Sequence, residues 1–598
     1  MGRPFAAPFY TGGVSEPTVT VPFSRVRDAP RSDDVTLLDA LARDLAAASY
    51  RHDDVVEALG EAAMAALSRE QPVPARRALA AREATNHLDP LASLIRLFLL
   101  GGAVGTERLD AALPSLGTGV AAGLGLVERD PDAPGLWRAS IDLRPHASDA
   151  NPELWVASDV GAHHRPGVLR TDHVLGIGQA SLTLAGATIR RPAARALDLG
   201  VGCGIQTFHL LFHCDHVTAT DLSERALGFT RFNLLLNHAA LRLDPARLQE
   251  RVSLRQGSLL EPVAGERFDL IVSNPPFVIT PRSSDEREED RFTYRDGGLP
   301  GDELVAGLWR GLASVLEPGG TAQMLANWEI APVPDDAGPG AAVASDPATG
   351  EPVPAWAVRP ASWTPPELEC WVIQRDLESP EGYAETWLRD ASEVRSPVAA
   401  ERRYAEYLDD FASRDVEAVG LGLVWLRRPA PGAAAGVGRR FETIEHAVDS
   451  PLGPVLGAAV WRMDAVASVD PGLVHAVAAP DVTVESHSRP GDEHPQAILL
   501  RQGGGLRRVA RLSTAEAGIV SACDGELPLG SLVRAVRALL EATAGDASAV
   551  PSEPELLGAV AELLRLGFLA FPDPADATAA DTRDEDAETG IPGRKTAE

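Results

Sequence analysis

The stretch "RFDLIVSNPPFVITPR", residues 267–282, places an asparagine and two prolines directly after a run of apolar residues. Proline has no backbone N–H, so a turn built from Asn274, Pro275 and Pro276 presents mainly hydrogen-bond acceptors. Two of them, the Asn274 side-chain oxygen and the Pro275 carbonyl oxygen, suit a group with two N–H bonds, such as a primary amide or an aromatic amine. Phe277 can stack on such a flat group. The tetrapeptide therefore predicts a site for a planar NH2 group.

A glycine-rich turn lies upstream, in "ALDLGVGCGIQTFHLL". Three glycines alternate with other residues after Asp198, namely Gly200, Gly202 and Gly204. Glycines there let the backbone approach a ligand closely and leave N–H groups free at the start of a helix. Asp221 lies 17 positions after Gly204, at the end of the next predicted strand, where an acid can bind both hydroxyls of a ribose.

These marks fit either a dinucleotide or S-adenosylmethionine. The turn at Asn274 decides between them, because a nicotinamide oxidoreductase would leave it without a purpose. An amide nitrogen is a poor nucleophile, since its lone pair is delocalised. Hydrogen bonds to Asn274 and Pro275 would hold it over a methyl group and strengthen as positive charge grows on nitrogen during in-line attack. The proton leaves after the nitrogen has become cationic, so no strong base is required.

Together, residues 198–204, Asp221 and residues 274–277 resemble the class I S-adenosylmethionine-dependent methyltransferases that modify planar nitrogens. These include release-factor glutamine, ribosomal RNA guanine-N2 and adenine-N6 methyltransferases. The segment "TYRDGGLPGDELVAGLWRGLASVLEPGG" resembles the one after the catalytic tetrapeptide in the glutamine methyltransferases. The arrangement also resembles a group of large bacterial methyltransferases with extra N- and C-terminal domains. The specific resemblance covers about residues 150–330.

The resemblance implies S-adenosyl-L-methionine as cofactor and two sets of site residues. The catalytic set is Asn274, Pro275, Pro276 and Phe277, and the cofactor-binding set is Asp198, Gly200, Gly202, Gly204, Asp221, Ser258, Leu259, Gln179 and Ser181. Family members often place an acid where Ser258 stands, to bind the adenine amino group. Because Ser258 is shorter and uncharged, that contact would pass to the backbone or to water. Gln179 and Ser181 lie where such enzymes close a loop over the cofactor.

Residues 151–330 alternate short β-branched strands with helical stretches, which predicts a parallel sheet with right-handed crossovers. Two later strands around the helix "YAEYLDDFASR" would complete seven strands. Ligands of such sheets bind at the carboxyl ends of the strands. The predicted fold class is α/β, with a Rossmann-like seven-stranded methyltransferase core flanked by mostly helical, winged-helix-like domains.

The predicted order of parts follows composition and periodicity. It is a flexible arm (1–30), a winged-helix-like domain (31–150), the methyltransferase domain (151–430, with an insert at about 332–365), a linker (431–440), a C-terminal domain that is winged-helix-like at its end (441–572) and a disordered acidic tail (573–598). The N-terminal domain has helix–turn–helix followed by two strands, as winged helices do. A small helical packing domain without a nucleic-acid role is the alternative.

Composition excludes several classes of function. A formal net charge of −30 argues against a protein that coats nucleic acid generally. The single lysine, Lys595 in the tail, excludes a P-loop or a Schiff base. The four cysteines have no CxxC pair and no metal-ligand spacing, so we expect no metal. With no apolar run long enough for a membrane span and no secretory signal, a cytoplasmic protein is expected.

The substrate is expected to be a macromolecule, either a protein glutamine or a base of RNA or DNA. Net acidity, the acidic run of residues 283–291 and the Gly-Gly segment favour protein, whereas winged-helix-like flanks favour nucleic acid. The sequence leaves this choice open and does not indicate an oligomeric state. A non-catalytic cofactor-binding adaptor or regulator, acting through its flanks, is the alternative function.

Overall fold

The computed structural model describes residues 23–69, 71–148, 151–161, 164–165, 169–281, 297–332, 343–346, 349–390, 397–433, 436–491, 494–543 and 550–572. Most of the predicted arm, the acidic run of residues 283–291 and the tail from residue 573 lie outside these ranges. Contacts divide the chain into two units. The first comprises residues 1–160, 221–247 and 254–257, and the second comprises residues 161–220, 248–253 and 258–598.

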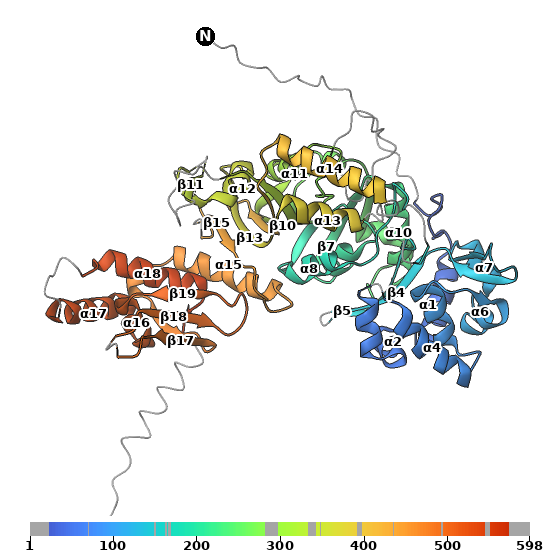
Figure 1. The fold of residues 1–598 in the computed structure, drawn as a ribbon, viewed down its shortest axis with the longest axis horizontal. Coiled ribbons are helices and arrows are strands. Elements are labelled where there is room, and N and C mark those ends of the chain that lie inside the picture. The colour runs from blue at the N-terminus through green and yellow to red at the C-terminus, as the bar shows by residue number, and fades with distance from the viewer. Residues whose placement is uncertain are drawn as a thin grey trace, which may run out of the picture. The chain divides into compact units, whose positions relative to one another are not determined.

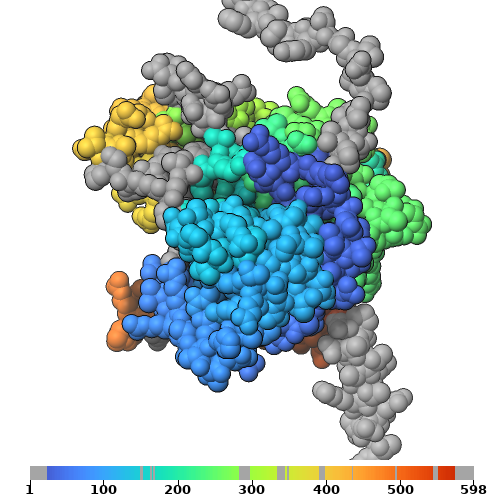
Figure 2. All heavy atoms as spheres, turned by 90° about the vertical axis from the view of Figure 1, so that its right-hand side faces the viewer, coloured from blue at the N-terminus to red at the C-terminus, as the bar shows by residue number. Residues whose placement is uncertain are grey.

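The first unit begins with short helices. They are α1 (Val35–Ala47), α2 (His52–Leu59), α3 (Glu61–Leu67), α4 (Val73–Thr85), α5 (Pro90–Leu94) with a π-helical continuation (Ile95–Leu99), α6 (Thr106–Ala112) and α7 (Thr118–Gly123). An antiparallel sheet of order β1-β3-β2 accompanies α5–α7, with β1 (Val104–Gly105), β2 (Val127–Arg129) and β3 (Leu136–Ala139). Figure 2 draws the atoms of these elements in blue to cyan.

A hairpin and a helix complete this unit. Strands β4 (Asp142–Ser148) and β5 (Asn151–Ser158) pair antiparallel, so the domain boundary predicted at residue 150 falls between two paired strands. Helix α10 (Glu224–Leu236) packs on β5. The Asn233 amide accepts from Ala157 N at 2.8 Å and donates to Ala157 O at 2.9 Å, which gives both buried backbone groups a partner.

The central sheet has eight strands, in the order β15-β13-β14-β10-β9-β6-β7-β8. They are β6 (Ala193–Leu199), β7 (Cys214–Asp221), β8 (Val252–Gln256), β9 (Phe268–Ser273), β10 (Leu316–Ile330), β13 (Glu369–Glu378), β14 (Ala418–Arg427) and β15 (Arg439–Thr443). β6 pairs parallel with β7 and β9, and β9 with β10, whereas β14 pairs antiparallel with β10 and β13. This confirms a Rossmann-like sheet in the middle of the chain.

The predicted number of seven strands is wrong, because β15 adds an eighth beside β13. Its residues were predicted as the end of a linker and the start of the next domain. The strand "RRFET" is short and mostly polar, since it lies at the edge of the sheet and its side chains are only half-buried. Edge position therefore removed the apolar pattern that marks the other strands.

Helices cover both faces of the sheet in the second unit (Figure 1). They are α8 (Gln179–Ala187), α9 (Ile205–Leu210), α11 (Glu303–Leu312), α12 (Val358–Trp363), α13 (Pro380–Asp390) and α14 (Pro397–Ser413). Trp309 of α11 and Trp328 of β10 are fully buried in the main core cluster. The predicted insert contains the hairpin β11 (Val343–Ser345) and β12 (Pro352–Pro354), followed by a 3-10 helix (Ala355–Ala357) and α12.

The C-terminal part of this unit begins with α15 (Gly453–Ala467). Its described residues continue with a 3-10 helix (Pro471–Leu473), two small antiparallel sheets and three α-helices. They are β16 (His475–Ala478), β17 (Val482–His487), β18 (Ala497–Gln502), β19 (Val509–Leu512), α16 (Thr514–Ser521), β20 (Asp524–Pro528), α17 (Leu529–Thr543), α18 (Glu553–Leu566) and β21 (Leu569–Ala570). The sheets have the orders β17-β18-β19 and β20-β16-β21. The middle strand β16 thus precedes the helices in the chain. In the part of the chain that the structure describes, no helix combines the length and apolarity needed to cross a membrane.

Candidate active site

The glycine turn joins β6 to α9. Gly200, Gly202 and Gly204 have φ angles of 79°, 56° and 98°, which side chains disfavour, and this explains why glycine occupies all three positions. The N–H groups of Gly200 and Val201 both donate to Thr220 O at 2.9 Å, which ties the turn to the end of β7. A Cβ on Gly202 would meet nothing within 4 Å, so the turn borders open space.

Two side chains next to this turn are buried. Asp198 is 1% exposed, and its Oδ2 accepts from Thr207 Oγ1 at 2.6 Å, so α9 fixes the carboxylate. Burial raises the pKa of the Cys203 thiol to about 12, which keeps it protonated near neutral pH. A small packed side chain is therefore the role that Cys203 fits.

The Asn-Pro-Pro-Phe turn follows β9, and it lies at the carboxyl end of that strand, as the glycine turn does for the neighbouring strand β6. Leu199 and Ser273 are register partners, so the residues after them, Gly200 and Asn274, leave neighbouring parallel strands together. Ser273 Oγ donates to Leu199 O at 2.9 Å. A Cβ on Gly200 would lie 3.8 Å from Asn274 O. The structure thus brings together the two motifs that the sequence predicted to cooperate.

The amide of Asn274 has an unusual environment. The residue is half-buried, yet its Oδ1 is buried and has no hydrogen-bond partner among the described residues. An acceptor in that state costs about 1–3 kcal/mol relative to a bonded one. Pro275 is buried, and Phe277 is half-buried against the main core cluster. The turn therefore fits a ligand that brings its own N–H donor.

A hydrogen-bond network behind the turn was not predicted. Asn327 Nδ2, from β10, donates to Phe277 O at 2.7 Å and to Tyr383 OH at 3.0 Å. Tyr383 OH also accepts from Ile279 N at 2.9 Å. The ring of Trp387 meets Phe277 edge-on, with centroids 6.2 Å apart and planes at 79°. The sequence signal that could have found α13 is a pair of aromatic residues four positions apart, Tyr383 and Trp387.

Asp221, predicted to hold the ribose, is the last residue of β7 and is half-buried. Its Oδ1 accepts from Ser223 N at 2.8 Å, and its carbonyl oxygen accepts from Gly257 N at 3.0 Å. These contacts fix the end of the strand and the orientation of the carboxylate. The contacts of Asp221 group it with the first unit, and its role toward a ribose stays a prediction.

The other predicted cofactor contacts lie in the second unit. Ser181 O accepts from Gln206 Nε2 at 2.8 Å, which joins α8 to the helix that follows the glycine turn. Gln179 is exposed at the start of α8. Ser258 and Leu259 are half-buried, and Leu259, with φ of 45°, packs against the main core cluster. Their roles also stay predictions.

The residues present fit S-adenosylmethionine at the glycine turn. Gly202 borders open space, and Asp198 is held in place beside the turn. Asn274, at the carboxyl end of the neighbouring strand, has an acceptor with no partner among the described residues. Within the described ranges, no three side chains of His, Cys, Asp or Glu are grouped as metal ligands.

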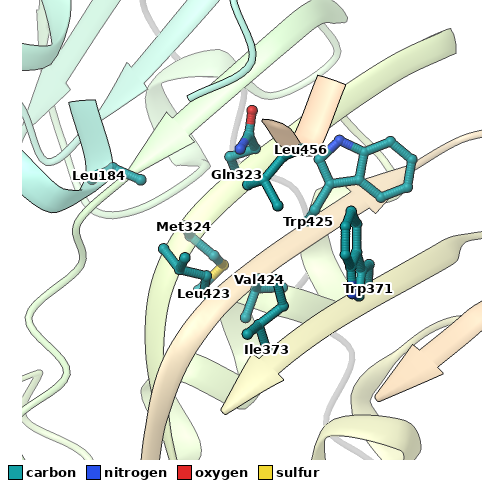
Figure 3. A pocket seen from close by; sticks show the side chains of 9 residues that line it. All are labelled: Leu184, Gln323, Met324, Trp371, Ile373, Leu423, Val424, Trp425 and Leu456. Carbon is teal, nitrogen blue, oxygen red and sulfur yellow. The ribbon is translucent and has the colours of Figure 1, made fainter. Parts of the chain in front are cut away.

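A separate small apolar pocket lies between the sheet, α8 and α15 (Figure 3). Its lining residues are Leu184, Gln323, Met324, Trp371, Ile373, Leu423, Val424, Trp425 and Leu456. The Gln323 amide accepts from Ile189 N at 2.7 Å and donates to Ala187 O at 2.9 Å, so its polar atoms serve the fold. The predicted site residues do not line this pocket, which we regard as a packing feature.

Comparisons with known proteins agree with this geometry. Residues 162–289 match the family model described as methyltransferase small domain, and residues 47–139 match one described as a domain of unknown function, DUF7059. A ribosomal protein uL3 glutamine methyltransferase of Bradyrhizobium diazoefficiens is 32% identical over 162 residues, 26% of this chain and 46% of that protein. A release factor glutamine methyltransferase of Geobacter sulfurreducens is 34% identical over 134 residues, 21% of this chain and 43% of that protein. The chain thus spans less than half the length of these relatives.

Among solved structures, a SAM-dependent methyltransferase from Thiobacillus denitrificans in complex with S-adenosyl-L-homocysteine covers 42% of this chain and 92% of its own. Its identity is 18% and its TM-score is 0.22. The sequence relatives and the family model confirm the resemblance that the motifs indicated. Residues 162–289 are thus similar to the methyltransferase small domain, and the chain is similar over 21–26% of its length to glutamine methyltransferases.

Proposed function

We propose that this protein transfers a methyl group from S-adenosylmethionine to the side-chain amide nitrogen of a glutamine in a protein substrate. The observation that carries the proposal is the buried Oδ1 of Asn274, which lies at the carboxyl end of β9 beside Gly200 and has no hydrogen-bond partner in the described part of the chain. The curated relatives that act on glutamine support the choice of an amide.

The roles of the chain's own residues follow from their chemistry. Asn274 Oδ1 and the Pro275 carbonyl oxygen accept the two amide hydrogens, and Phe277 lies against the flat amide group. Pro276 stiffens the turn, so these acceptors need little reorganisation. When bound, S-adenosylmethionine supplies an electrophilic methyl group. The two acceptors strengthen their hydrogen bonds as positive charge develops on the attacking nitrogen, and this favours in-line transfer.

The cofactor would be held by residues of the glycine turn and of the neighbouring loops. Those residues are Asp198, Gly200, Gly202, Gly204, Asp221, Ser258, Leu259, Gln179 and Ser181. The backbone at Gly202 lies next to open space, and Asp198 is fixed by Thr207. Asp221 supplies a carboxylate whose position the Ser223 N–H sets.

The flanking parts would present the protein substrate. The order of α5, β1, α6, α7, β2 and β3, with β3 in the middle of the sheet, supports a winged-helix-like N-terminal module. Its last helix, α7, has the sequence "TGVAAG" and no basic residue. Because Lys and Arg supply the electrostatic part of the affinity for phosphates, a helix without them favours a protein-contact role over nucleic-acid binding.

The test uses the full chain with methyl-labelled S-adenosylmethionine and a fractionated lysate. Label that protease removes and nuclease does not, located on glutamine by peptide mass analysis, supports the proposal. Nuclease-sensitive label would instead show transfer to a base. Cofactor binding without any transfer to either fraction would favour the adaptor function.

A further inference from the structure

The connection between β13 and β14 carries an unexpected helical hairpin. The two strands pair antiparallel along their length, and such neighbours can be joined by a tight turn. Instead, α13 and α14 stand between them and pack on each other. Their buried aromatic side chains, together with Ile279 and Val419, form a separate core cluster that includes Tyr383, Tyr407 and Phe411.

This cluster is joined to the Asn274–Phe277 turn by directed contacts. Ile279, 1% exposed, donates its N–H to Tyr383 OH at 2.9 Å. Asn327, 0% exposed, donates to both Phe277 O and Tyr383 OH. The backbone immediately after the tetrapeptide is therefore held on both sides of Val278 by one hydroxyl and one amide.

Trp387 lies one helical turn after Tyr383 on α13 and contacts the Phe277 ring of the tetrapeptide. Its ring is 5.8 Å from Tyr383 and meets the half-buried Phe277 ring edge-on at 6.2 Å. Edge-to-face packing fixes the plane of the Phe277 ring. Since Trp387 is itself only half-buried, it extends the aromatic surface beyond Phe277.

We propose, resting on the function above, that α13 is part of the acceptor site. Asn327 and Tyr383 are positioning residues that set the backbone of the turn, and Trp387 extends the surface that receives the substrate amide. Displacing the turn by about 1 Å would cost up to roughly 100-fold in rate, because the attacking nitrogen and the methyl group would no longer be aligned.

The test compares Tyr383→Phe with Tyr407→Phe, which removes a hydroxyl from the same aromatic cluster. Amide hydrogen exchange at Ile279, measured without substrate, should rise roughly tenfold in Tyr383→Phe because its N–H loses an acceptor. The kcat for methyl transfer should fall about 10- to 100-fold with little change in KM. The affinity for S-adenosylhomocysteine should stay near the parent value, since the glycine turn is untouched. Tyr407→Phe should leave exchange at Ile279 and kcat unchanged.

Trp387 is tested in the same assay. Trp387→Ala should raise the KM for the protein substrate several-fold more than it lowers kcat, and Trp387→Phe should restore most of the affinity. An unchanged KM in Trp387→Ala would remove this residue from the acceptor site.

Different results would overturn the positioning role of Tyr383 and the proposed transfer to glutamine. Unchanged exchange at Ile279 in Tyr383→Phe, or an equal response in Tyr407→Phe, overturns the positioning role. If the parent protein methylates no glutamine, the proposed function is wrong, and the exchange contrast still decides whether α13 holds the turn.

Discussion

Replacing Asn274 with alanine should separate activity from stability. Its Oδ1 is buried and has no partner among the residues that the structure describes, which costs about 1–3 kcal/mol. Truncation removes that cost and also removes the packing of a half-buried side chain, about 1 kcal/mol. We therefore expect the free energy of unfolding to stay within about 1 kcal/mol of the parent value or to rise. Methyl transfer should fall by roughly 10²–10³, or about 2.7–4 kcal/mol in activation free energy, because one preorganised acceptor is lost.

Asn233 provides the matched control. It is also a buried asparagine, 0% exposed, but its amide bonds both Ala157 N and Ala157 O. Asn233→Ala leaves two buried backbone groups without partners, at a cost of about 2–6 kcal/mol in stability. Thermal unfolding of both variants, calorimetric binding of S-adenosylhomocysteine and labelled methyl transfer form the assay. Asn274→Ala should bind the cofactor product like the parent.

Two results would refute this reasoning. Transfer by Asn274→Ala at the parent rate would show that its oxygen does not hold the acceptor. A loss of thermal stability as large as that of Asn233→Ala would show that Asn274 serves the fold. Only the combination of retained stability, retained binding and lost transfer supports the assigned role.

Three further outcomes follow from the structure. Asp221→Ala should weaken S-adenosylmethionine binding by about 10- to 100-fold, because hydrogen bonds to a charged group are lost. The kcat at saturating cofactor should stay near the parent value. Calorimetry measures the affinity, and saturation kinetics measure kcat. Gly200 has a φ of 79°, so Gly200→Ala should lower the free energy of unfolding by about 1–2 kcal/mol. Gly307 is exposed in the middle of α11, and a new Cβ there would have no atom within 4 Å. Gly307→Ala should therefore raise the free energy of unfolding by about 0.5–1 kcal/mol, measured by thermal unfolding. Burial lowers the pKa of His146 from 6.5 to about 4, so between these pH values the unfolded chain binds a proton that the folded chain does not. The free energy of unfolding should therefore fall by on the order of 3 kcal/mol as the pH falls from 6.5 towards 4. The variant His146→Leu should flatten this part of the curve of stability against pH.

The glycine turn and the tetrapeptide could be predicted because each is a local pattern. A strand, a turn residue type and the next helix lie within one short stretch, and parallel strands then bring successive turns to one edge of the sheet. The pairing of Leu199 with Ser273 is the physical expression of that rule. Their proximity followed from the alternation of strands and helices between them, which predicts a parallel sheet.

The Asn327–Tyr383 network could not be predicted in this way. Asn327 lies 50 residues from Phe277 in the chain, and Tyr383 lies 104 residues from Ile279. The sequence does not distinguish a residue that only packs in the core from one that positions a site. This holds for a buried asparagine inside a strand and for a tyrosine on an apolar helix face. Only the pairing of β10, β13 and β14, which is long-range, decides which backbone groups they meet.

An unpartnered oxygen alone does not mark a binding site, and Asn327 shows why. Its Oδ1 is also buried without a partner among the described residues, but the whole side chain is 0% exposed and enclosed behind the turn. Asn274 differs because it is half-exposed, leaves a strand at the carboxyl edge and lies beside a glycine turn that borders open space. Asn274 as a residue is thus partly open to solvent, whereas Asn327 is enclosed. The positional difference, rather than the missing hydrogen bond, is the reason that we propose catalysis for Asn274 and positioning for Asn327.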